Sequence, residues 1–349
     1  MPYQVGLDLG SAGTAVATDR GVTTTPRRTG SPAGEIPQVL DDLARRHGEP
    51  PSRVALAHPL TWPHEHLEQL RQDLIDTGRP DVLFVPAPHA AALAFDEDAR
   101  MPEHGTVAVV DFGATGCDIA VLRKQGVFLL AGQPERVEGG GHLFDDLVAE
   151  HVIAKIGTHS RELLRSCVEA KELLGSYPEV RIPYVADNGE MREVRFSRLE
   201  LESLIRPSVG LAVDALERLA GLCVPDVVLL VGGSSRIPLV AKEISARLDI
   251  PVLRAPDGAT ATGALLEAKQ LEPGPAQETT VEVPVPRAED EKPKRHLQTT
   301  PFIATGLLAL VLGGGWAAHE AMNQPQVHTE NTSVRLEAPG TAELPCITE

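Results

Sequence analysis

The stretch VAVVDFGATGCDIAVL, residues 107–122, places two apolar runs on either side of a glycine-containing turn. The first run is rich in valine and leads to Asp111, and the turn holds Gly113 and Gly116. This pattern predicts a buried strand, a tight turn and a returning strand. A carboxylate at the point where a buried strand meets a glycine turn suits a metal ion held beside a phosphate. The stretch therefore raises the hypothesis of a nucleotide site.

A second stretch of the same kind lies near the N-terminus. Residues 5–18, VGLDLGSAGTAVAT, again give an apolar strand, an aspartate (Asp8), a turn with Gly10 and Ser11, and a returning strand. We interpret the pair as an internal duplication of a phosphate-facing hairpin, in which glycine lets backbone N–H groups approach an anion. A third glycine turn follows a buried strand in LLVGGSSRIP, residues 229–238. The chain has no Walker A pattern and no GxGxxG opening a βαβ unit, so neither a P-loop nor a Rossmann site is indicated.

Composition narrows the class of protein. The chain has 349 residues, is 42% hydrophobic and carries a net charge of −17. This charge disfavours nucleic acid as a partner. The four cysteines form no CxxC, and the first three lie in apolar runs, which predicts buried, reduced thiols. Apolar strand patterns alternate with helical periodicity over residues 1–271, which predicts an α/β fold, with Ser160 and the Ser197–Glu200 capping box beginning two of the helices.

The C-terminal quarter of the sequence differs from the rest. Residues 272–296 are rich in Pro, Thr and Glu and end in KPKRH, which predicts a disordered linker with a basic end. Residues 297–318 carry no charge and are long enough for one transmembrane helix, and residues 319–349 form a short acidic tail. Because positive charge stays on the cytoplasmic side, we expect a single-pass protein of the cell membrane with a cytoplasmic N-terminal domain and an extracytoplasmic tail.

Taken in order, these motifs resemble the nucleotide-binding domain of the 70-kilodalton heat-shock chaperones (the DnaK type), within the actin-like ATPase superfamily. Four further stretches support the likeness, namely residues 54–95, 138–152, 167–175 (CVEAKELLG) and 255–268. The resemblance covers about residues 3–271. It implies two RNase H-like lobes, each on a mixed five-stranded sheet, around a cleft that holds ATP or ADP with Mg²⁺. The chain is also similar to membrane-anchored forms found in actinobacteria.

The resemblance implies roles for particular residues. Asp8 and Asp111 would hold Mg²⁺ through water and position the attacking water. The positions that would contact the nucleotide are Gly10, Ser11, Gly113, Gly140, Gly141, Lys171, Gly232, Gly233, Ser234, Arg236 and Asp257.

The chain also departs from the family pattern. Ala12 stands where the family has a hydroxyl, and the second hairpin reads Gly113, Ala114, Thr115, Gly116 in place of three glycines and a threonine. The family's metal-side glutamate falls on Ala87, and residues 19–52 contain no segment that matches the one with the catalytic lysine.

The nucleoside helix departs as well. Val168, Glu172 and Gly175 replace a glutamate, an arginine and a serine of the family. A glutamate cannot reproduce the stacking of an arginine on adenine.

These observations favour a membrane-anchored, DnaK-like ATP-binding protein without a substrate-binding domain. We expect its ATPase to be weak or absent, and we expect it to act as an interaction or regulatory module with an unknown protein partner. One alternative is an active chaperone-type ATPase. The other is an actin-like cytoskeletal or secretion-associated protein tethered to the membrane.

Overall fold

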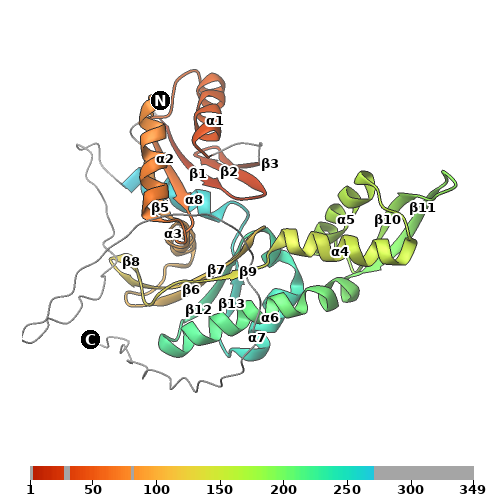
Figure 1. Cartoon of the computed structure of the whole chain (residues 1–349). Helices are drawn as coiled ribbons and strands as arrows, with labels where there is room; N and C mark the ends of the chain where they lie inside the picture. Colours follow the sequence, from red (N-terminus) through yellow and green to blue (C-terminus); the bar gives the residue numbers. More distant parts are fainter. Residues whose placement is uncertain (1–2, 27–31, 80–81, 271–349) are drawn as a thin grey trace, which may run out of the picture. The chain divides into compact units, whose positions relative to one another are not determined.

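The computed structural model describes residues 3–26, 32–79 and 82–270 (Figure 1). The predicted linker, transmembrane segment and tail, residues 272–296, 297–318 and 319–349, lie outside the described residues. No helix within the described part of the chain is long and apolar enough to cross a membrane.

The first sheet contains the N-terminal hairpin and has the strand order β3-β2-β1-β4-β5. Its first three strands are antiparallel neighbours, and β4 and β5 then add in parallel to β1. Parallel neighbours need crossover connections, and helices provide them here. The strands are β1 (Gln4–Leu9), β2 (Gly13–Thr18), β3 (Gly21–Pro26), β4 (Arg53–His58) and β5 (Val82–Pro86). Helices α1 (Pro32–His47) and α2 (His64–Asp76) lie between strands of this sheet in the chain. Helix α3 (Ala87–Ala99) follows β5, and α8 (Ala259–Gln270) packs on the sheet from the end of the described chain.

The second sheet repeats this order as β8-β7-β6-β12-β13. Here too an antiparallel meander is extended by two parallel strands, so the duplicated hairpin lies within a duplicated sheet. The expectation of five strands in each sheet is wrong for this one, because β9 pairs with β7 as a sixth strand. The strands are β6 (Thr106–Phe112), β7 (Gly116–Gln125), β8 (Val127–Leu130), β9 (Glu135–Glu138), β12 (Val227–Val231) and β13 (Val252–Arg254).

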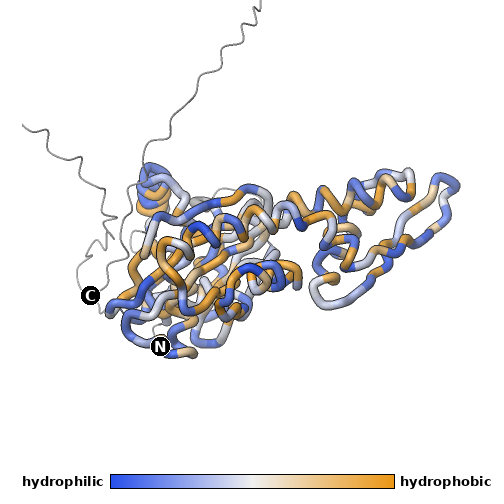
Figure 2. The backbone as a smooth tube through the Cα atoms, turned by 90° about the horizontal axis from the view of Figure 1, so that it is seen from below, coloured by the Kyte–Doolittle hydropathy of each residue, from blue (hydrophilic) through white to orange (hydrophobic). Residues whose placement is uncertain are grey.

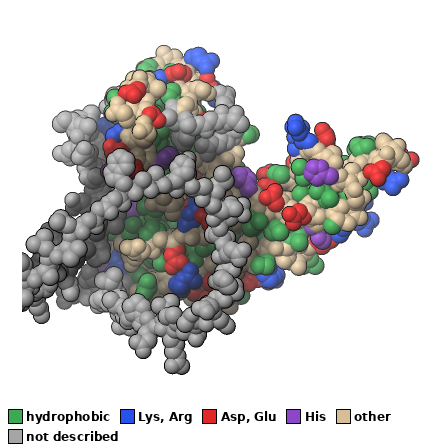
Figure 3. All heavy atoms as spheres, in the orientation of Figure 1, with side chains coloured by type: hydrophobic (Ala, Val, Ile, Leu, Met, Phe, Trp, Pro, Cys, Tyr) green, Lys and Arg blue, Asp and Glu red, His purple; other side chains and the backbone are tan. Residues whose placement is uncertain are grey.

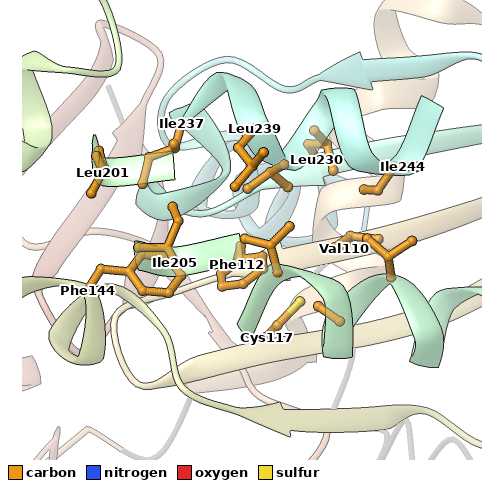
Figure 4. Close-up of a cluster of buried hydrophobic side chains, with 14 of the residues drawn as sticks. Val110, Phe112, Cys117, Phe144, Leu201, Ile205, Leu230, Ile237, Leu239 and Ile244 are labelled. Carbon is orange, nitrogen blue, oxygen red and sulfur yellow. The ribbon is translucent and has the colours of Figure 1, made fainter. Parts of the chain in front are cut away.

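Alternate residues of a strand point to opposite faces of its sheet, and in the second sheet side chains on both faces are buried. On β6, Val110 and Phe112 join one core, and Val107 and Val109 join another. The first core packs against helices that follow β9, and Figure 4 shows side chains of β6, β12, α6 and α7 meeting there. These later elements are α4 (Gly141–Ile156), α5 (Arg161–Leu173), α6 (Arg198–Leu222), the 3₁₀ turn η1 (Gly233–Arg236) and α7 (Pro238–Arg247).

Helices α3 and α8 connect the two sheets. Helix α8 packs on β1, β2 and β4 of the first sheet, and α3 contacts both β4 and β5 of the first sheet and β6, β7 and β8 of the second. The two helices approach each other closely at Gly263, where a Cβ atom would lie 1.6 Å from the Ala90 carbonyl oxygen. Helix α8 approaches β1 in the same way, since a Cβ on Gly6 would lie 2.0 Å from the Ala261 carbonyl oxygen. Small residues therefore set the spacing of the layers that carry the two hairpins.

The helix starts expected from the sequence are confirmed. Ser160 accepts a hydrogen bond from the Leu163 N–H at 3.1 Å, and Ser197 and Glu200 form the reciprocal capping box. Cys117, Cys167 and Cys223 are buried, as predicted, while Cys346 lies outside the described residues.

The sequence analysis missed helix α1, strands β3, β8, β9 and β13, and the hairpin of β10 (Glu179–Val185) and β11 (Met191–Ser197). Most of this hairpin is hydrophilic in Figure 2, which matches its exposed burial pattern. On the face shown in Figure 3, acidic and basic side chains are interspersed over the part that holds α4, α5, β10 and β11.

Candidate functional site

The turns of the two duplicated hairpins meet each other. The Ser11 hydroxyl of the β1–β2 turn lies 3.4 Å from the Thr115 hydroxyl of the β6–β7 turn. Each turn follows a strand that carries an aspartate, Asp8 on β1 and Asp111 on β6. The first turn is tight, since a Cβ on Gly10 would lie 3.0 Å from the Gly13 carbonyl oxygen. The structure thus brings together Asp8, Ser11, Asp111 and Thr115, although the two turns are about a hundred residues apart in sequence.

The two aspartates lie in a setting that disfavours their negative charge. Burial raises the pKa of Asp8 to about 6. The pKa of Asp111 is raised to about 7, first by burial and then by the negative charges of Asp8 and Asp118, while Arg136 opposes the shift. A divalent cation would relieve this repulsion. Two neighbouring carboxylates that leave room for water suit Mg²⁺, which usually keeps several water ligands. Among the described residues, no group of three or more His, Cys, Asp or Glu side chains could hold a metal ion.

The start of α4 packs directly under the second turn. The Gly141 N–H donates to the Gly113 carbonyl at 3.0 Å, and the Ser234 hydroxyl donates to the same carbonyl at 3.1 Å. From α5, the Lys171 ammonium donates to the Gly141 carbonyl at 3.2 Å and lies 2.7 Å from the Asp145 carboxylate. Four of the expected contact residues therefore form one cluster: Gly113, Gly141, Lys171 and Ser234.

Two glycines next to this cluster, Gly140 and Gly232, have no room for a side chain. A Cβ on Gly140 would lie 2.4 Å from the Gly113 carbonyl oxygen. Gly232 has φ of +82° and ψ of 156°, a conformation open almost only to glycine, and a Cβ there would lie 2.4 Å from an Asp111 carboxylate oxygen. Gly233, in contrast, has no atom within 4 Å of its Cβ position.

Two further expected residues, Arg236 and Asp257, lie on η1 and just before α8. Arg236 of η1 and Asp257 form an ion pair, and both side chains are exposed. Such an exposed pair contributes little to stability. The end of α5 approaches η1, because a Cβ on Gly175 would lie 3.6 Å from the Arg236 carbonyl oxygen. Glu172, one turn before, is exposed.

The sequence analysis missed two charged residues of this region. Asp118 stands opposite Asp111 in the β6–β7 register, and Arg136 of β9 donates to the Asp118 carboxylate at 2.8 Å. The register of a tight hairpin, read from the sequence, would have placed Asp118 beside Asp111. No comparable signal marked Arg136, because its position depends on the pairing of β9 with β7.

The sheets and their hairpins are consistent with the actin-like ATPase fold. The chain belongs to the Hsp70 family: the sequence model described as "Hsp70 protein" matches residues 82–283, more than half of the chain.

The chain is similar to curated chaperones of the HscA type. It is 31% identical over 260 residues to a chaperone protein HscA homolog of Azotobacter vinelandii, over 69% of this chain and 41% of the relative. It is 34% identical over 200 residues to the homolog of Shewanella putrefaciens, covering 53% and 32% of the two chains. It is 31% identical over 249 residues to HscA of Salmonella paratyphi B, covering 67% and 40%. The chain thus spans about two fifths of the length of the first of these relatives.

The raised pKa of Asp111 leads to a prediction about stability. The folded protein holds this proton to a higher pH than the unfolded chain does, so ionising Asp111 destabilises the fold as pH rises from about 4 to about 7. We therefore expect Asp111→Asn, in metal-free and nucleotide-free buffer, to stabilise the protein by roughly 1–3 kcal/mol at about pH 8 and by little at about pH 4. Thermal unfolding at both pH values measures the difference.

The control for this prediction is Asp187→Asn, at an exposed position of the β10–β11 turn. We expect it to change the unfolding temperature by the same small amount at both pH values. A destabilising Asp111→Asn at about pH 8 would show that the carboxylate has a partner that offsets its burial.

Proposed function

We propose that this chain binds an adenine nucleotide with Mg²⁺ between the two hairpin turns. The observation that carries the proposal is the meeting of the Ser11 and Thr115 hydroxyls, in turns that follow two strands with buried aspartates of raised pKa. Membership of the Hsp70 family supports it, since members of this family bind ATP or ADP.

The proposed roles follow the geometry. Asp8 and Asp111 hold the hydrated Mg²⁺ and orient the phosphates around it. Backbone N–H groups of glycine turns bind phosphate oxygens, and the missing side chains let the backbone come close. Lys171 supplies positive charge beneath Gly141. The full set proposed for phosphate and nucleoside contact is Gly10, Ser11, Gly113, Gly140, Gly141, Lys171, Gly232, Gly233, Ser234, Arg236 and Asp257.

A pair of substitutions at Gly233 tests this assignment. The position is open, so Gly233→Ala should keep the fold and nucleotide binding. Gly233→Asp adds a carboxylate beside the proposed phosphate site without a cation to offset it, and we expect it to abolish binding of Mg·ATP and Mg·ADP. Calorimetric titration of the full chain, with thermal unfolding as a check of folding, measures both. Equal affinities for the two folded variants would place the nucleotide elsewhere.

We further propose that hydrolysis is slow or absent and that the chain acts as an interaction or regulatory module of the DnaK type. Two features support this. Ala87 stands at the family's metal-side glutamate, and the first lysine of the chain is Lys124, so the first sheet and the helices α1, α2 and α3 contain no lysine. The family match ends at residue 283, within the Pro- and Glu-rich segment 272–296, and the uncharged segment 297–318 follows this segment.

We propose, last, that residues 297–318 anchor the protein in the cell membrane with its N-terminal domain in the cytoplasm, as in the actinobacterial membrane-anchored forms. Lys292, Lys294 and Arg295 immediately before the uncharged run support this orientation. We therefore expect a reporter fused after Glu349 to lie outside the cytoplasm and a reporter fused to the N-terminus to lie in the cytoplasm. Intact chain that stays in the supernatant after ultracentrifugation of gently lysed cells would contradict the anchor.

A further inference from the structure

The guanidinium of Arg136 reaches the second hairpin turn from β9 and donates in three directions. Nη1 donates to the Asp118 carboxylate at 2.8 Å, Nε donates to Glu138 at 3.1 Å, and Nη2 donates to the Thr115 hydroxyl at 3.0 Å. A planar group held by three acceptors has a fixed orientation, which lowers the entropic cost of binding an anion.

The turn leaves room for this side chain because residue 116 is glycine. A Cβ on Gly116 would lie 3.0 Å from Nη2 and 3.2 Å from Cζ of Arg136, and 2.7 Å from the Val137 carbonyl oxygen. A larger residue at this position would push the guanidinium off the turn. Thr115 at this position accepts a hydrogen bond from Arg136, and Gly116 leaves the space that the Arg136 side chain occupies.

Arg136 is linked through Thr115 to the point where the two turns meet. Because the Thr115 oxygen accepts from Arg136, its own hydrogen is left to donate to Ser11, 3.4 Å away, or to an anion between the turns. The positive charge of Arg136 is also felt at Asp111, whose pKa it lowers.

The negative charges at the site would repel a bound phosphate unless a positive group such as Arg136 lay beside them. Asp8 and Asp118 both repel the charge of Asp111, and a triphosphate adds further negative charge. The first sheet and the helices α1, α2 and α3 contain no lysine. Lys171 contacts the cluster on the Gly141 side, whereas Arg136 contacts the tip of the turn.

We propose that Arg136 recognises the terminal phosphate of a nucleoside triphosphate, so that this residue makes the site prefer ATP to ADP. It does so by its charge and by holding Thr115 as a hydroxyl donor. The inference rests on the proposed nucleotide site and adds a specificity-determining residue to it.

The test compares the affinities of the full chain for Mg·ATP and Mg·ADP by calorimetric titration. A charge-assisted hydrogen bond to phosphate predicts that Arg136→Gln weakens ATP binding by roughly tenfold or more, while ADP binding changes little. Arg136→Lys keeps the charge but not the fork, so we expect it to recover only part of the preference. The matched control is Arg181→Gln on β10, which removes an exposed arginine paired with Glu193 and should change neither affinity.

Removing Arg136 alone leaves Asp118 without its cation, so the double variant Arg136→Gln/Asp118→Asn is measured beside Asp118→Asn. We expect the double variant to lose as much preference for ATP, compared with Asp118→Asn, as Arg136→Gln loses compared with the wild type. Unchanged preference in the folded variants, or an equal loss of ATP and ADP binding, overturns the inference and leaves the nucleotide site standing. A wild-type chain that binds neither nucleotide overturns the proposed function itself, and the inference falls with it.

Discussion

Gly263→Ala is expected to destabilise the folded protein by about 4 kcal/mol, near the upper end of what single substitutions cost. The added Cβ would lie 1.6 Å from the carbonyl oxygen and 2.3 Å from the carbonyl carbon of Ala90. These are backbone atoms of α3, so no side-chain rotation relieves the overlap. Helices α3 and α8 would have to separate, which would disturb the packing of α8 on the first sheet and of α3 on both sheets.

The measurement is the thermal unfolding midpoint, which should fall by roughly 10 °C for a domain of this size. The matched control is Gly210→Ala in α6, where no atom lies within 4 Å of the Cβ position. There the higher helix propensity of alanine should stabilise the protein by roughly 0.5–1 kcal/mol. Alanine has the same helix propensity in α6 and in α8. A fall in the unfolding midpoint for Gly263→Ala, together with a rise for Gly210→Ala, therefore reports the overlap with Ala90. Equal midpoints for the two variants would disprove the close packing of α3 on α8.

Phosphate release from bound ATP is expected to be at least about a thousandfold slower than in an active Hsp70 nucleotide-binding domain assayed alongside. Removing one group that stabilises a transition state typically slows a reaction by roughly 10²–10³. By the resemblance to the family, two such groups have no counterpart in this chain: Ala87 stands at the position of the glutamate, and no lysine precedes Lys124. Ala87→Glu alone should recover little, because groups that act as a unit are not additive.

Single-turnover release by the full chain measures this rate, and titration of the same samples confirms that nucleotide is bound. Asp111→Asn serves as the control for the remaining activity, since it removes a proposed metal-side carboxylate. Release at the rate of the active domain that disappears in Asp111→Asn would mean that another cation replaces the missing lysine. Arg136 would then be the first residue to substitute, because it contacts the tip of the second turn.

The sequence by itself determined the two hairpins, the α/β class and most of the helices between them. Short apolar runs lead to Asp8 and Asp111, and the glycine turns that follow them are typical of strands joined in a tight hairpin. Local signals of this kind act over a few residues. The sequence therefore also predicted that Ser160 and Ser197 begin two of the helices. The resemblance to the Hsp70 family rested on the same local stretches.

Tertiary structure alone decided which residues meet across long separations. Strand β9 has four residues and no strong strand pattern, and only its pairing with β7 brings Arg136 to Thr115. The requirement for glycine at position 263 comes from the backbone of Ala90 on another helix. The pKa of Asp111 is likewise raised first by burial and then by Asp8, which lies on a different sheet. Distance and burial set these effects, and both are fixed only when separate elements of the chain pack together.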